Sequence, residues 1–301
     1  MLVAVVHTEG SVCRCHEAIA GALTRGGHEA VVVDALGLVE RGASLARGAR
    51  VAFDHTDTVR GSGRRRGESR RVLEAAGISV AGGTADACDL ADDKARARDR
   101  MSGTVPMPRG RLMEWNHAGP HAIGWPRVLK SPHEHMSRGV ALVRDAAEQR
   151  DRAFLLSQAY GDPVLVEEYI EGREVAVTVL EGPHELETMP VVEWPRKEVL
   201  LSLDEKLDPG VVPFLASLHA KETAAIVEAS RAAFLALGLR DYARVDLRLA
   251  ADGRAYVLEV NPRPSLEPDA PTAICAPIIG LTLDELILSL LARAAARAGC
   301  R

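Results

Sequence analysis

Residues 244–264, RVDLRLAADGRAYVLEVNPRP, contain two alternating apolar–polar runs on either side of a turn. Asp252-Gly253 is a preferred two-residue hairpin turn, because Gly tolerates the positive φ that such turns require. The sequence therefore predicts an antiparallel hairpin in which residue 251 pairs with residue 254. In each predicted strand the apolar residues recur with a period of two, as in half-buried strands: Val245, Leu247 and Leu249 in the first, and Tyr256, Leu258 and Val260 in the second.

The polar face of this hairpin brings two carboxylates together. In the predicted register Asp246 lies opposite Glu259, and Arg244 lies opposite Asn261. Like charges about 5 Å apart destabilise a sheet, and at an effective dielectric of ~20 their repulsion approaches about 3 kcal/mol. Oxygen ligands grouped in this way suit a hard divalent cation, to which Asn261 adds a neutral oxygen. A solvated face with outward-turned carboxylates is the alternative, and the spacing alone leaves both open.

Composition narrows the class of protein. The chain has 301 residues, of which 47% are hydrophobic and 26% charged, as is ordinary for a soluble globular protein. A net charge of −5 gives no electrostatic reason to expect a nucleic-acid partner. The start, MLVAVVHTEG, is typical of a buried first strand, and no apolar stretch approaches 18 residues, so we expect a cytoplasmic protein without a membrane span. Five cysteines without a C-x-x-C pair predict neither a disulfide framework nor a zinc site.

The first part of the chain alternates between strand and helix patterns. Short β-branched runs at 2–6, 30–33 and 50–53 are separated by helical segments, which predicts a small parallel sheet with helices on its faces. A further strand at 78–80 ends this domain, whose boundary we place at residue 83.

Later segments predict helices, a second hairpin and a long loop. Residues 89–103 read as one helix, and another helix begins near residue 139. Residues 164–170 and 174–180 read as the two strands of a hairpin, and the proline-containing loop 195–219 has the length of a functional lid.

The order of several elements resembles a known family. Lys94 lies on a helix, and Lys130 ends a strand that is followed by the polar loop 131–139. The segment LVEEYIEGREVAVTVL (165–180) comes next, and the opening hairpin follows about 70 residues later. In this order the chain resembles the ATP-grasp enzymes of the D-alanine–D-alanine ligase branch over nearly its whole length.

The resemblance implies a mixed α/β and α+β fold of three parts. A parallel α/β domain over residues 1–83 precedes a central ATP-grasp lobe over 84–168 and a C-terminal lobe over 169–301. The two lobes are expected to clasp ATP between their sheets. A homodimer is the usual state of the family.

The resemblance also assigns the nucleotide site. Lys94 and Lys130 would neutralise phosphates of ATP as compact charges. Two Mg²⁺ ions, with Mn²⁺ as the alternative metal, would be held by Asp246, Glu259 and Asn261. The adenine would lie against the backbone of a strand edge, and the ribose against a carboxylate; these residues are Glu167, Glu168, Tyr169 and Ile170 for adenine and Glu174 for ribose.

Catalytic roles follow from the same resemblance. Arg244 would stabilise the negative charge of a tetrahedral intermediate. Ser137 belongs to the loop that would close over the γ-phosphate and exclude water. Lys206 corresponds to the lysine of the family's long lid loop, but Leu207 stands where the family has a tyrosine.

Substrate residues are less well defined, because the chain departs from the family here. Glu9 and Glu17 are the candidates for binding a substrate amine. His55 follows the third strand at a carboxyl end, where such sheets bind ligands, and a structural role is the alternative. Arg263 stands in N-P-R-P-S where the family has N-x-x-P-G; it could pair with a substrate carboxylate or with a carboxylate of its own chain.

These features predict an ADP-forming carboxylate–amine ligase that acts through an acyl phosphate on small amino-acid-like substrates. Specialised biosynthesis is the expected setting, with either intermolecular ligation or ring closure. A divergent D-alanine–D-alanine ligase of cell-wall synthesis is one alternative. A non-catalytic ATP-binding sensor is another, although Arg244, Asp246, Glu259 and Asn261 are all present.

Overall fold

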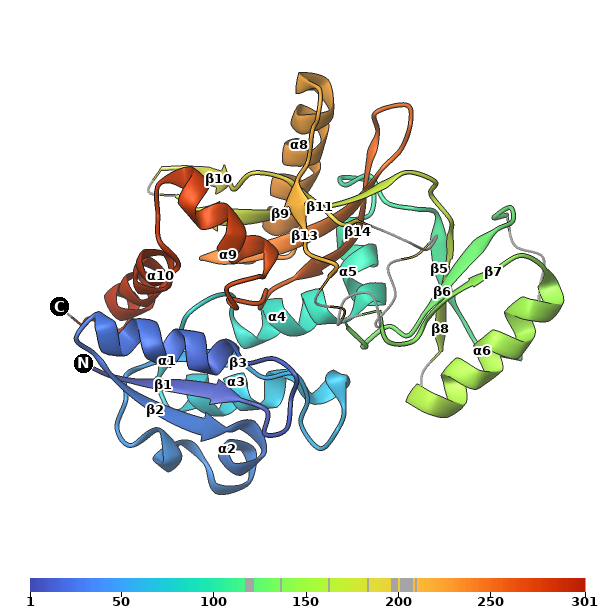
Figure 1. The fold of residues 1–301 in the computed structure, drawn as a ribbon. Helices are drawn as coiled ribbons and strands as arrows, with labels where there is room; N and C mark the ends of the chain where they lie inside the picture. The colour runs from blue at the N-terminus through green and yellow to red at the C-terminus, as the bar shows by residue number, and fades with distance from the viewer. Residues whose placement is uncertain are drawn as a thin grey trace.

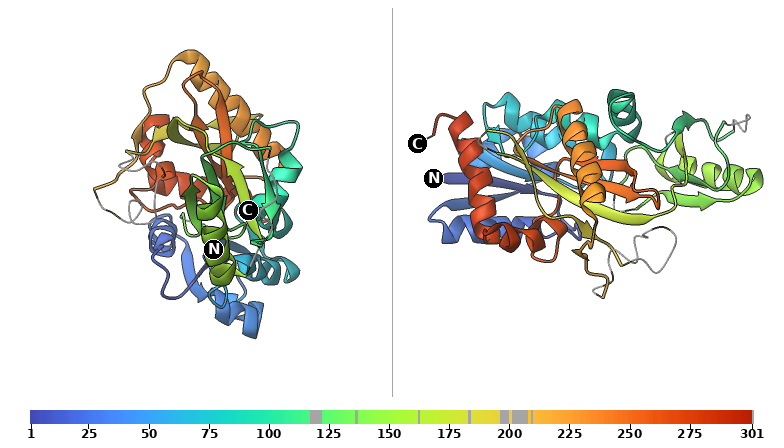
Figure 2. Two further views of the ribbon diagram at one scale, coloured as in Figure 1. Left: turned by 90° about the vertical axis from the view of Figure 1, so that its right-hand side faces the viewer. Right: turned by 90° about the horizontal axis from the view of Figure 1, so that it is seen from above.

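The computed structural model describes residues 1–116, 122–135, 137–161, 163–182, 184–195, 200, 208 and 210–300. These residues form three sheets (Figure 1). The first domain and the lobe that contains β5–β8 lie at opposite ends of the molecule, with a six-stranded sheet between them (Figure 2). The expected combination of one parallel sheet with two further α+β lobes is confirmed.

The first domain is the predicted parallel sheet, in the order β2-β1-β3-β4. Its strands and helices are β1 (Leu2–His7), α1 (Cys15–Arg25), β2 (Glu29–Asp34), α2 (Ala35–Arg41), η1 (Ala43–Ala46), β3 (Val51–His55), η2 (Gly63–Arg65), α3 (Gly67–Ala75) and β4 (Ser79–Val80).

The last helix of the chain, α10 (Leu283–Arg297), packs against this domain. Ile287 and Leu290 share a core with Val5 and Phe53, so the two ends of the chain lie side by side (Figures 1 and 2). Thr282 and Glu285 form the capping box that begins the helix. The N-terminal domain is thus completed by the end of the chain.

The helix expected over 89–103 is in fact two helices, α4 (Ala85–Asp92) and α5 (Lys94–Met101). Asp93 separates them with an extended backbone (φ −91°, ψ 97°), and its side chain accepts hydrogen bonds from the N–H groups of Ala95 and Arg96. An Asp at this position caps a new helix and competes with helix continuation. The break puts Lys94 at the first position of α5.

The central lobe has a four-stranded antiparallel sheet in the order β5-β8-β6-β7. Its elements are β5 (Gly110–Met113), β6 (Arg127–Lys130), β7 (Val140–Val143), α6 (Ala146–Tyr160) and β8 (Val164–Glu168). The helix expected from residue 139 begins instead at Ala146, after its N-cap Asp145. Residues 140–143 pair with β6, and this sheet pairing overrides the helical pattern.

The C-terminal lobe has a six-stranded sheet covered by α8 (Ala220–Ala236). Its strands are β9 (Arg173–Glu181), β10 (Leu186–Thr188), β11 (Val192–Glu193), β12 (Phe214–Leu215), β13 (Tyr242–Leu249) and β14 (Ala255–Asn261), and α9 (Pro271–Cys275) and η3 (Ala276–Ile279) follow.

The predicted hairpin of residues 164–170 and 174–180 is wrong. Strand β8 pairs with β5 and β6, whereas β9 pairs with β10, β11 and β13 in the other sheet. The chain therefore crosses between two sheets at residues 169–172. Gly172 (φ 154°) permits this crossing, because a Cβ there would lie 2.1 Å from the carbonyl oxygen of Leu249.

The opening hairpin keeps the predicted polar pairs despite a different turn. Asp246 lies opposite Glu259 and Arg244 opposite Asn261, as predicted. The turn has three residues instead of two, since the N–H of Ala250 donates to the carbonyl of Arg254. A β-bulge beside Leu247 absorbs the difference in register. The core face of β14 therefore differs from the predicted one. It consists of Ala255 and Val257 on the turn side of the bulge and Val260 on the other side. Tyr256 and Leu258, which were predicted to lie on this face, do not.

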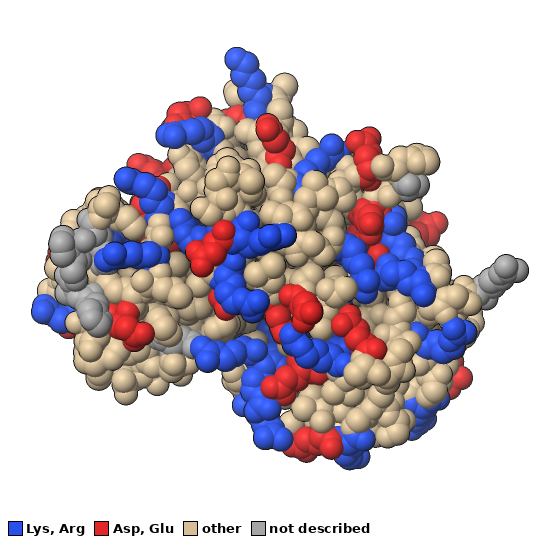
Figure 3. Space-filling view, turned by 180° about the vertical axis from the view of Figure 1, so that it is seen from behind, with Lys and Arg blue, Asp and Glu red and all other residues tan. Residues whose placement is uncertain are grey.

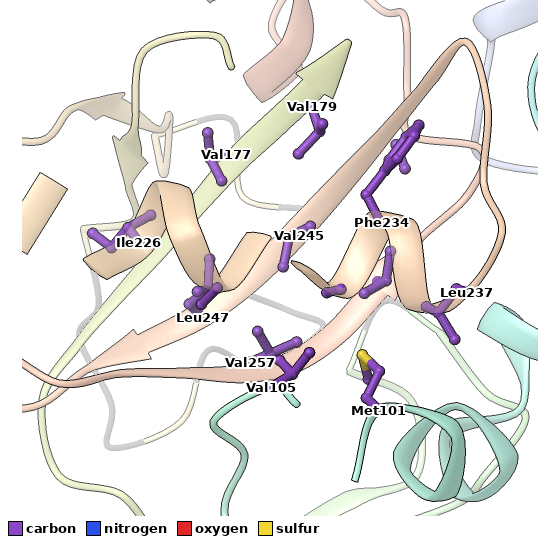
Figure 4. Close-up of a cluster of buried hydrophobic side chains, with 14 of the residues drawn as sticks. Met101, Val105, Val177, Val179, Ile226, Phe234, Leu237, Val245, Leu247 and Val257 are labelled. Carbon is purple, nitrogen blue, oxygen red and sulfur yellow. The ribbon is translucent and has the colours of Figure 1, made fainter. Parts of the chain in front are cut away.

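Apolar side chains of α8 and the sheet form the largest core (Figure 4). Leu247 is fully buried there, in the same core as Ile226. We expect Leu247→Ala to lower the free energy of unfolding by about 2–5 kcal/mol, through lost burial and a cavity. Leu235→Ala, at a position that is 66% exposed, should change it by less than about 0.5 kcal/mol. Urea unfolding of both variants checks this, and equal effects would contradict the packing.

Lys and Arg side chains are interspersed with Asp and Glu over the face shown in Figure 3, in keeping with the modest net charge of −5. Among the described residues no single helix has both the length and the apolar character needed to cross a membrane. One pair of helical segments, 271–279 and 283–297, meets that test only jointly and is bent by 96°.

Candidate active site

Two adjoining cavities lie along the polar face of the β13–β14 hairpin. The larger, of about 390 Å³, is bordered by the first domain, the loop after β6 and the C-terminal lobe. The smaller, of about 80 Å³, lies between the central and C-terminal lobes. Both are lined by Lys94, Glu134, Glu174, Asp246 and Glu259. The residues shared by the two cavities thus include the opposed carboxylates.

Each carboxylate of the hairpin has a cation beside it. Arg244 donates two hydrogen bonds to Asp246, with Nε–Oδ1 at 2.6 Å and a second N–O distance of 2.8 Å. The Nζ atom of Lys94 lies 3.3 Å from Oε2 of Glu259. Burial tends to lower the pKa of Arg244, but Asp246 outweighs this and leaves that pKa raised. These ion pairs offset the repulsion between the opposed carboxylates.

The donor set of this face fits a hard divalent cation. Asp246 and Glu259 supply carboxylate oxygens from neighbouring strands, and Asn261 supplies an amide oxygen that also accepts the N–H of Arg263 at 3.0 Å. Since all three side chains line the larger cavity, a cation bound there would be accessible to a ligand.

Lys130 and Glu167 form a buried ion pair beside the smaller cavity. Nζ of Lys130 lies 2.6 Å from Oε2 of Glu167, and Arg98 donates to the other oxygen at 2.8 Å. Glu167 and Glu168 lie in β8, which has paired strands on both sides. The expected strand edge is therefore wrong for these two residues. All four residues predicted to bind adenine nevertheless line the smaller cavity, with Tyr169 and Ile170 directly after the strand.

Glu174 lies at the wall between the cavities, where Arg248 donates a hydrogen bond to it at 2.9 Å. Arg248 was not among the predicted site residues, yet it lines the smaller cavity and also donates to the carbonyl of Gly172. Its position two residues after Asp246, on the same polar face, was the signal that could have identified it.

The polar loop 131–139 spans both cavities. The N–H of Ser131 donates to the carbonyl of Gly139, and Lys94 donates to the carbonyls of Pro132 and, through Nζ, Glu134. Ser137 has a left-handed backbone (φ 60°) and lines the smaller cavity beside Lys94 and Lys130. Residues of this loop therefore line both cavities.

A contact with the first domain holds the same loop. Nε2 of His135 lies 3.6 Å from Oδ1 of Asp57, whose carboxylate also accepts the hydroxyl of Ser11. Burial opposes ionisation of Asp57, but hydrogen bonds from His135 and Ser11 lower its pKa below the usual range. Through His135 the loop therefore has a carboxylate partner in the first domain.

Arg263 is buried among carboxylates of its own chain. This favours the predicted role in which it pairs with its own chain over the role in which it pairs with a substrate carboxylate. It donates to Asp92 and lies 3.5 Å from Asp54, and Arg66 donates to Asp92 at 3.2 Å. Arg70, which is also buried, lies 3.3 Å from Asp54. Burial raises the pKa of Asp54, but Arg70 and Arg263 outweigh it and lower that pKa.

We expect Arg263→Met to lower the free energy of unfolding by about 3–5 kcal/mol, because it leaves buried carboxylates without their cation. Arg254→Met is the matched control: its partner is Asp252 at 2.7 Å, its side chain is 71% exposed, and the loss should stay below about 1 kcal/mol. The difference in stability between the two variants should persist at neutral pH and shrink in acid. The pKa values of Asp54 and Asp92 are lower in the folded protein than in the unfolded chain, so these carboxylates stabilise the fold at pH values above the unfolded-state pKa. This stabilisation is lost as the pH falls through the folded-state pKa. Denaturation at several pH values checks both points.

The remaining predicted residues have three different outcomes. His55 is buried, lines the larger cavity and has Nε2 3.0 Å from the hydroxyl of Tyr242. Glu9 and Glu17 are exposed and do not line it, so the structure does not support their proposed role at the substrate. Glu17 points to solvent because α1 buries Cys15 and Ile19 instead. Lys206 lies outside the described residues.

Two cysteines near His55, at the edge of the larger cavity, were not among the site residues predicted from the sequence. The Sγ atoms of Cys13 and Cys15 lie 2.7 Å apart, and Cys13 lines the larger cavity with His55 and Glu267. Hydrogen bonds from Cys13 and His55 lower the pKa of Cys15 to about 4, against the opposing effect of burial. Spacing along the chain could not reveal this group, because Glu267 follows some 250 residues later.

Comparison with known proteins identifies the family. The family model described as "D-ala D-ala ligase C-terminus" matches residues 109–292. A D-alanine–D-alanine ligase of Stutzerimonas stutzeri is 31% identical over 281 residues, covering 90% of this chain and 87% of its own. The chain belongs to the D-alanine–D-alanine ligase family. It is accordingly an ADP-forming carbon–nitrogen ligase of the ATP-grasp type, as the resemblance implied.

Two further proteins are similar to this chain. The uncharacterized protein y4sG of Sinorhizobium fredii is 31% identical over 292 residues, covering 92% of this chain and 86% of its own. A crystal structure of D-alanine–D-alanine ligase from Bacillus anthracis complexed with ATP superposes with a TM-score of 0.78 at 20% identity, covering 99% of this chain and 98% of that one. The ATP-grasp fold expected for this ligase is thereby confirmed.

Proposed function

We propose that this ligase joins a carboxylate to an amine of amino-acid-like substrates other than a pair of D-alanines, in a specialised biosynthetic pathway. The observation that carries the proposal is the polar face of the β13–β14 hairpin. There Arg244, Asp246, Glu259 and Asn261 border the larger cavity, which adjoins a second cavity lined by two lysines. One cavity suits the nucleotide and the other suits the group that receives its phosphate.

ATP is proposed to occupy the smaller cavity, with its phosphates directed toward Lys94, Lys130 and the loop that carries Ser137. Asp246, Glu259 and Asn261 would hold two Mg²⁺ or Mn²⁺ ions, which neutralise charge on the phosphates when bound. Tyr169 and Ile170 would contact the adenine and Glu174 the ribose. Glu174 and Lys130 are both held by ion pairs, with Arg248 and Glu167 respectively.

The proposed reaction has two steps. An oxygen of the substrate carboxylate attacks the γ-phosphorus of ATP, the bond to the β,γ-bridging oxygen breaks, and an acyl phosphate and ADP form. The amine nitrogen then attacks the acyl carbon, a proton is lost from nitrogen, and the C–O bond breaks to release phosphate. The guanidinium of Arg244 would stabilise the oxyanion between attack and release, and the loop 131–139 would exclude water.

The ion-pair network at the wall of the larger cavity supports an anionic substrate group. Arg66, Arg70 and Arg263 face the carboxylates of Asp54 and Asp92. The Nε atom of Arg263 is buried and has no hydrogen-bond partner among the described residues. Since Arg66 and Arg263 both line the cavity, a substrate carboxylate would find two guanidinium groups at this wall.

Synthesis of D-alanyl-D-alanine is the second candidate, and the names of relatives with 30–31% identity favour it. The substrate end of the cavity argues against it. Glu9 and Glu17 lie away from the cavity, which is lined there by Cys13 and His55. Leu207 replaces the tyrosine of the family's lid.

Release of ADP with Mg²⁺, measured over single and paired D- and L-amino acids and their analogues, tests the proposal. Turnover that requires two different compounds establishes intermolecular ligation, and turnover with one compound is resolved by product mass into self-ligation or ring closure. Selective turnover with D-alanine alone would restore the cell-wall function. Binding of ATP without ADP release across the panel would favour the sensor.

A further inference from the structure

The thiols of Cys13 and Cys15 are directed at each other at the edge of the larger cavity. Cys15 is the first residue of α1 and is buried, whereas Cys13 is half-buried in the preceding loop. Their Sγ atoms lie 2.7 Å apart, closer than two unbonded sulfur atoms normally approach. A covalent bond between the sulfurs, or a cation that both sulfurs bind, would relieve such crowding.

A carboxylate converges on the same point from the other end of the chain. The ligand atoms of Cys13, Cys15 and Glu267 all lie within 4.8 Å of one another. Glu267 is held in place, since its Oε1 accepts the N–H of Arg14 at 2.8 Å and its Oε2 accepts the hydroxyl of Ser265 at 3.0 Å. These bonds leave each oxygen with a lone pair for a further partner.

An imidazole lies beside this group. His55 is next to Cys15, and its Nε2 lies 3.0 Å from the hydroxyl of Tyr242. Histidines that bind metals commonly use their second ring nitrogen in this way, which fixes the orientation of the ring.

We propose that Cys13, Cys15, Glu267 and His55 bind a soft divalent cation of the Zn²⁺ class. A disulfide would account for the two sulfurs but not for the carboxylate and imidazole that meet them. Two thiolates, a carboxylate and an imidazole form a tetrahedral ligand set that prefers Zn²⁺ to Mg²⁺. This separates the site from the oxygen ligands of the hairpin, which suit a hard cation.

Binding requires only a small local movement. A tetrahedral ion with Zn–S bonds of about 2.3 Å holds its sulfurs roughly 3.8 Å apart, so the thiols must separate by about 1 Å. Cys13 lies outside any helix or strand and can supply this movement, with release of the thiol proton. The bound ion would tie the β1–α1 loop to the segment after β14.

Titration with Co²⁺ tests the site without any assay of turnover. The full chain, reduced with a phosphine, should develop a thiolate-to-cobalt charge-transfer band with one equivalent of Co²⁺, and Zn²⁺ should abolish it. Oxygen ligands of the hairpin cannot produce this band. Cys15→Ser should lower its intensity, because one of the two thiolates is lost, and Glu267→Gln should weaken binding by roughly tenfold or more. Cys300→Ser, at a half-buried cysteine outside the group, should leave it unchanged.

A folded protein without the band, or a band of unchanged intensity in Cys15→Ser, would overturn the proposal. Cys13→Ser guards against misfolding, because that residue is half-buried in a loop. Zn²⁺ should raise the melting temperature of the wild-type protein but not of Cys13→Ser. A mass decrease of about 2 Da with glutathione disulfide, in a protein that binds no cation, would assign the pair to redox chemistry instead.

Discussion

Arg244→Ala is expected to lower turnover by about 10²–10³-fold, the usual effect of removing a group that stabilises an oxyanion. The affinity for ATP should change little, because Arg244 lines the larger cavity but not the smaller one. Binding of ATP measured by calorimetry, together with kcat from ADP release, separates the two effects. Parallel losses of affinity and turnover would contradict the oxyanion role.

The control for this variant is Arg254→Ala. Arg254 lies near the tip of the same hairpin, pairs with Asp252 and is largely exposed, so kcat should remain within about twofold of wild type. Arg244→Ala also leaves Asp246 without its cation. Unfolding curves of the variant therefore accompany the kinetics, and a protein that remains folded at the assay temperature makes the loss of kcat interpretable.

The double variant Asp246→Asn, Glu259→Gln should lower turnover by about 10³-fold or more. The ions that these carboxylates are proposed to hold contribute several kcal/mol of stabilisation to the charge of the transition state. The substitutions remove repulsion between the opposed carboxylates but also leave Arg244 without its carboxylate partner, so unfolding curves accompany the kinetics. The single variants should need higher Mg²⁺ concentrations for half-maximal turnover.

Asp252→Asn serves as the matched control, because it removes a carboxylate from the turn of the same hairpin. Its Mg²⁺ dependence should match that of wild type. Unchanged Mg²⁺ dependence in the single variants Asp246→Asn and Glu259→Gln would show that these carboxylates do not hold the ions.

The hairpin shows why part of the site could be predicted from the sequence. A period of two and a Gly-containing turn are local signals, and they placed Asp246 opposite Glu259 correctly. The turn itself was wrong by one residue, and the β-bulge beside Leu247 compensated for it. Agreement at the polar pairs thus depended on an irregularity that alternation alone does not reveal.

Long-range pairing explains what the sequence could not provide. Strands β8 and β9 are neighbours in the chain, and only their distant partners decide that they lie in different sheets. The same limit applies to Arg263, whose carboxylate partners Asp54 and Asp92 come from other elements. Cys13 and Glu267 likewise become neighbours only through the fold.

The formation of an acyl phosphate is tested most directly by isotope transfer. A turned-over substrate whose carboxylate carries ¹⁸O is incubated with ATP and Mg²⁺, and the released phosphate is analysed by mass spectrometry. The account predicts one ¹⁸O atom per phosphate, because a carboxylate oxygen bonds to phosphorus and leaves with it. Phosphate without the label, or phosphate that takes its oxygen from ¹⁸O-water, would show that water attacks ATP and would contradict the proposed ligation.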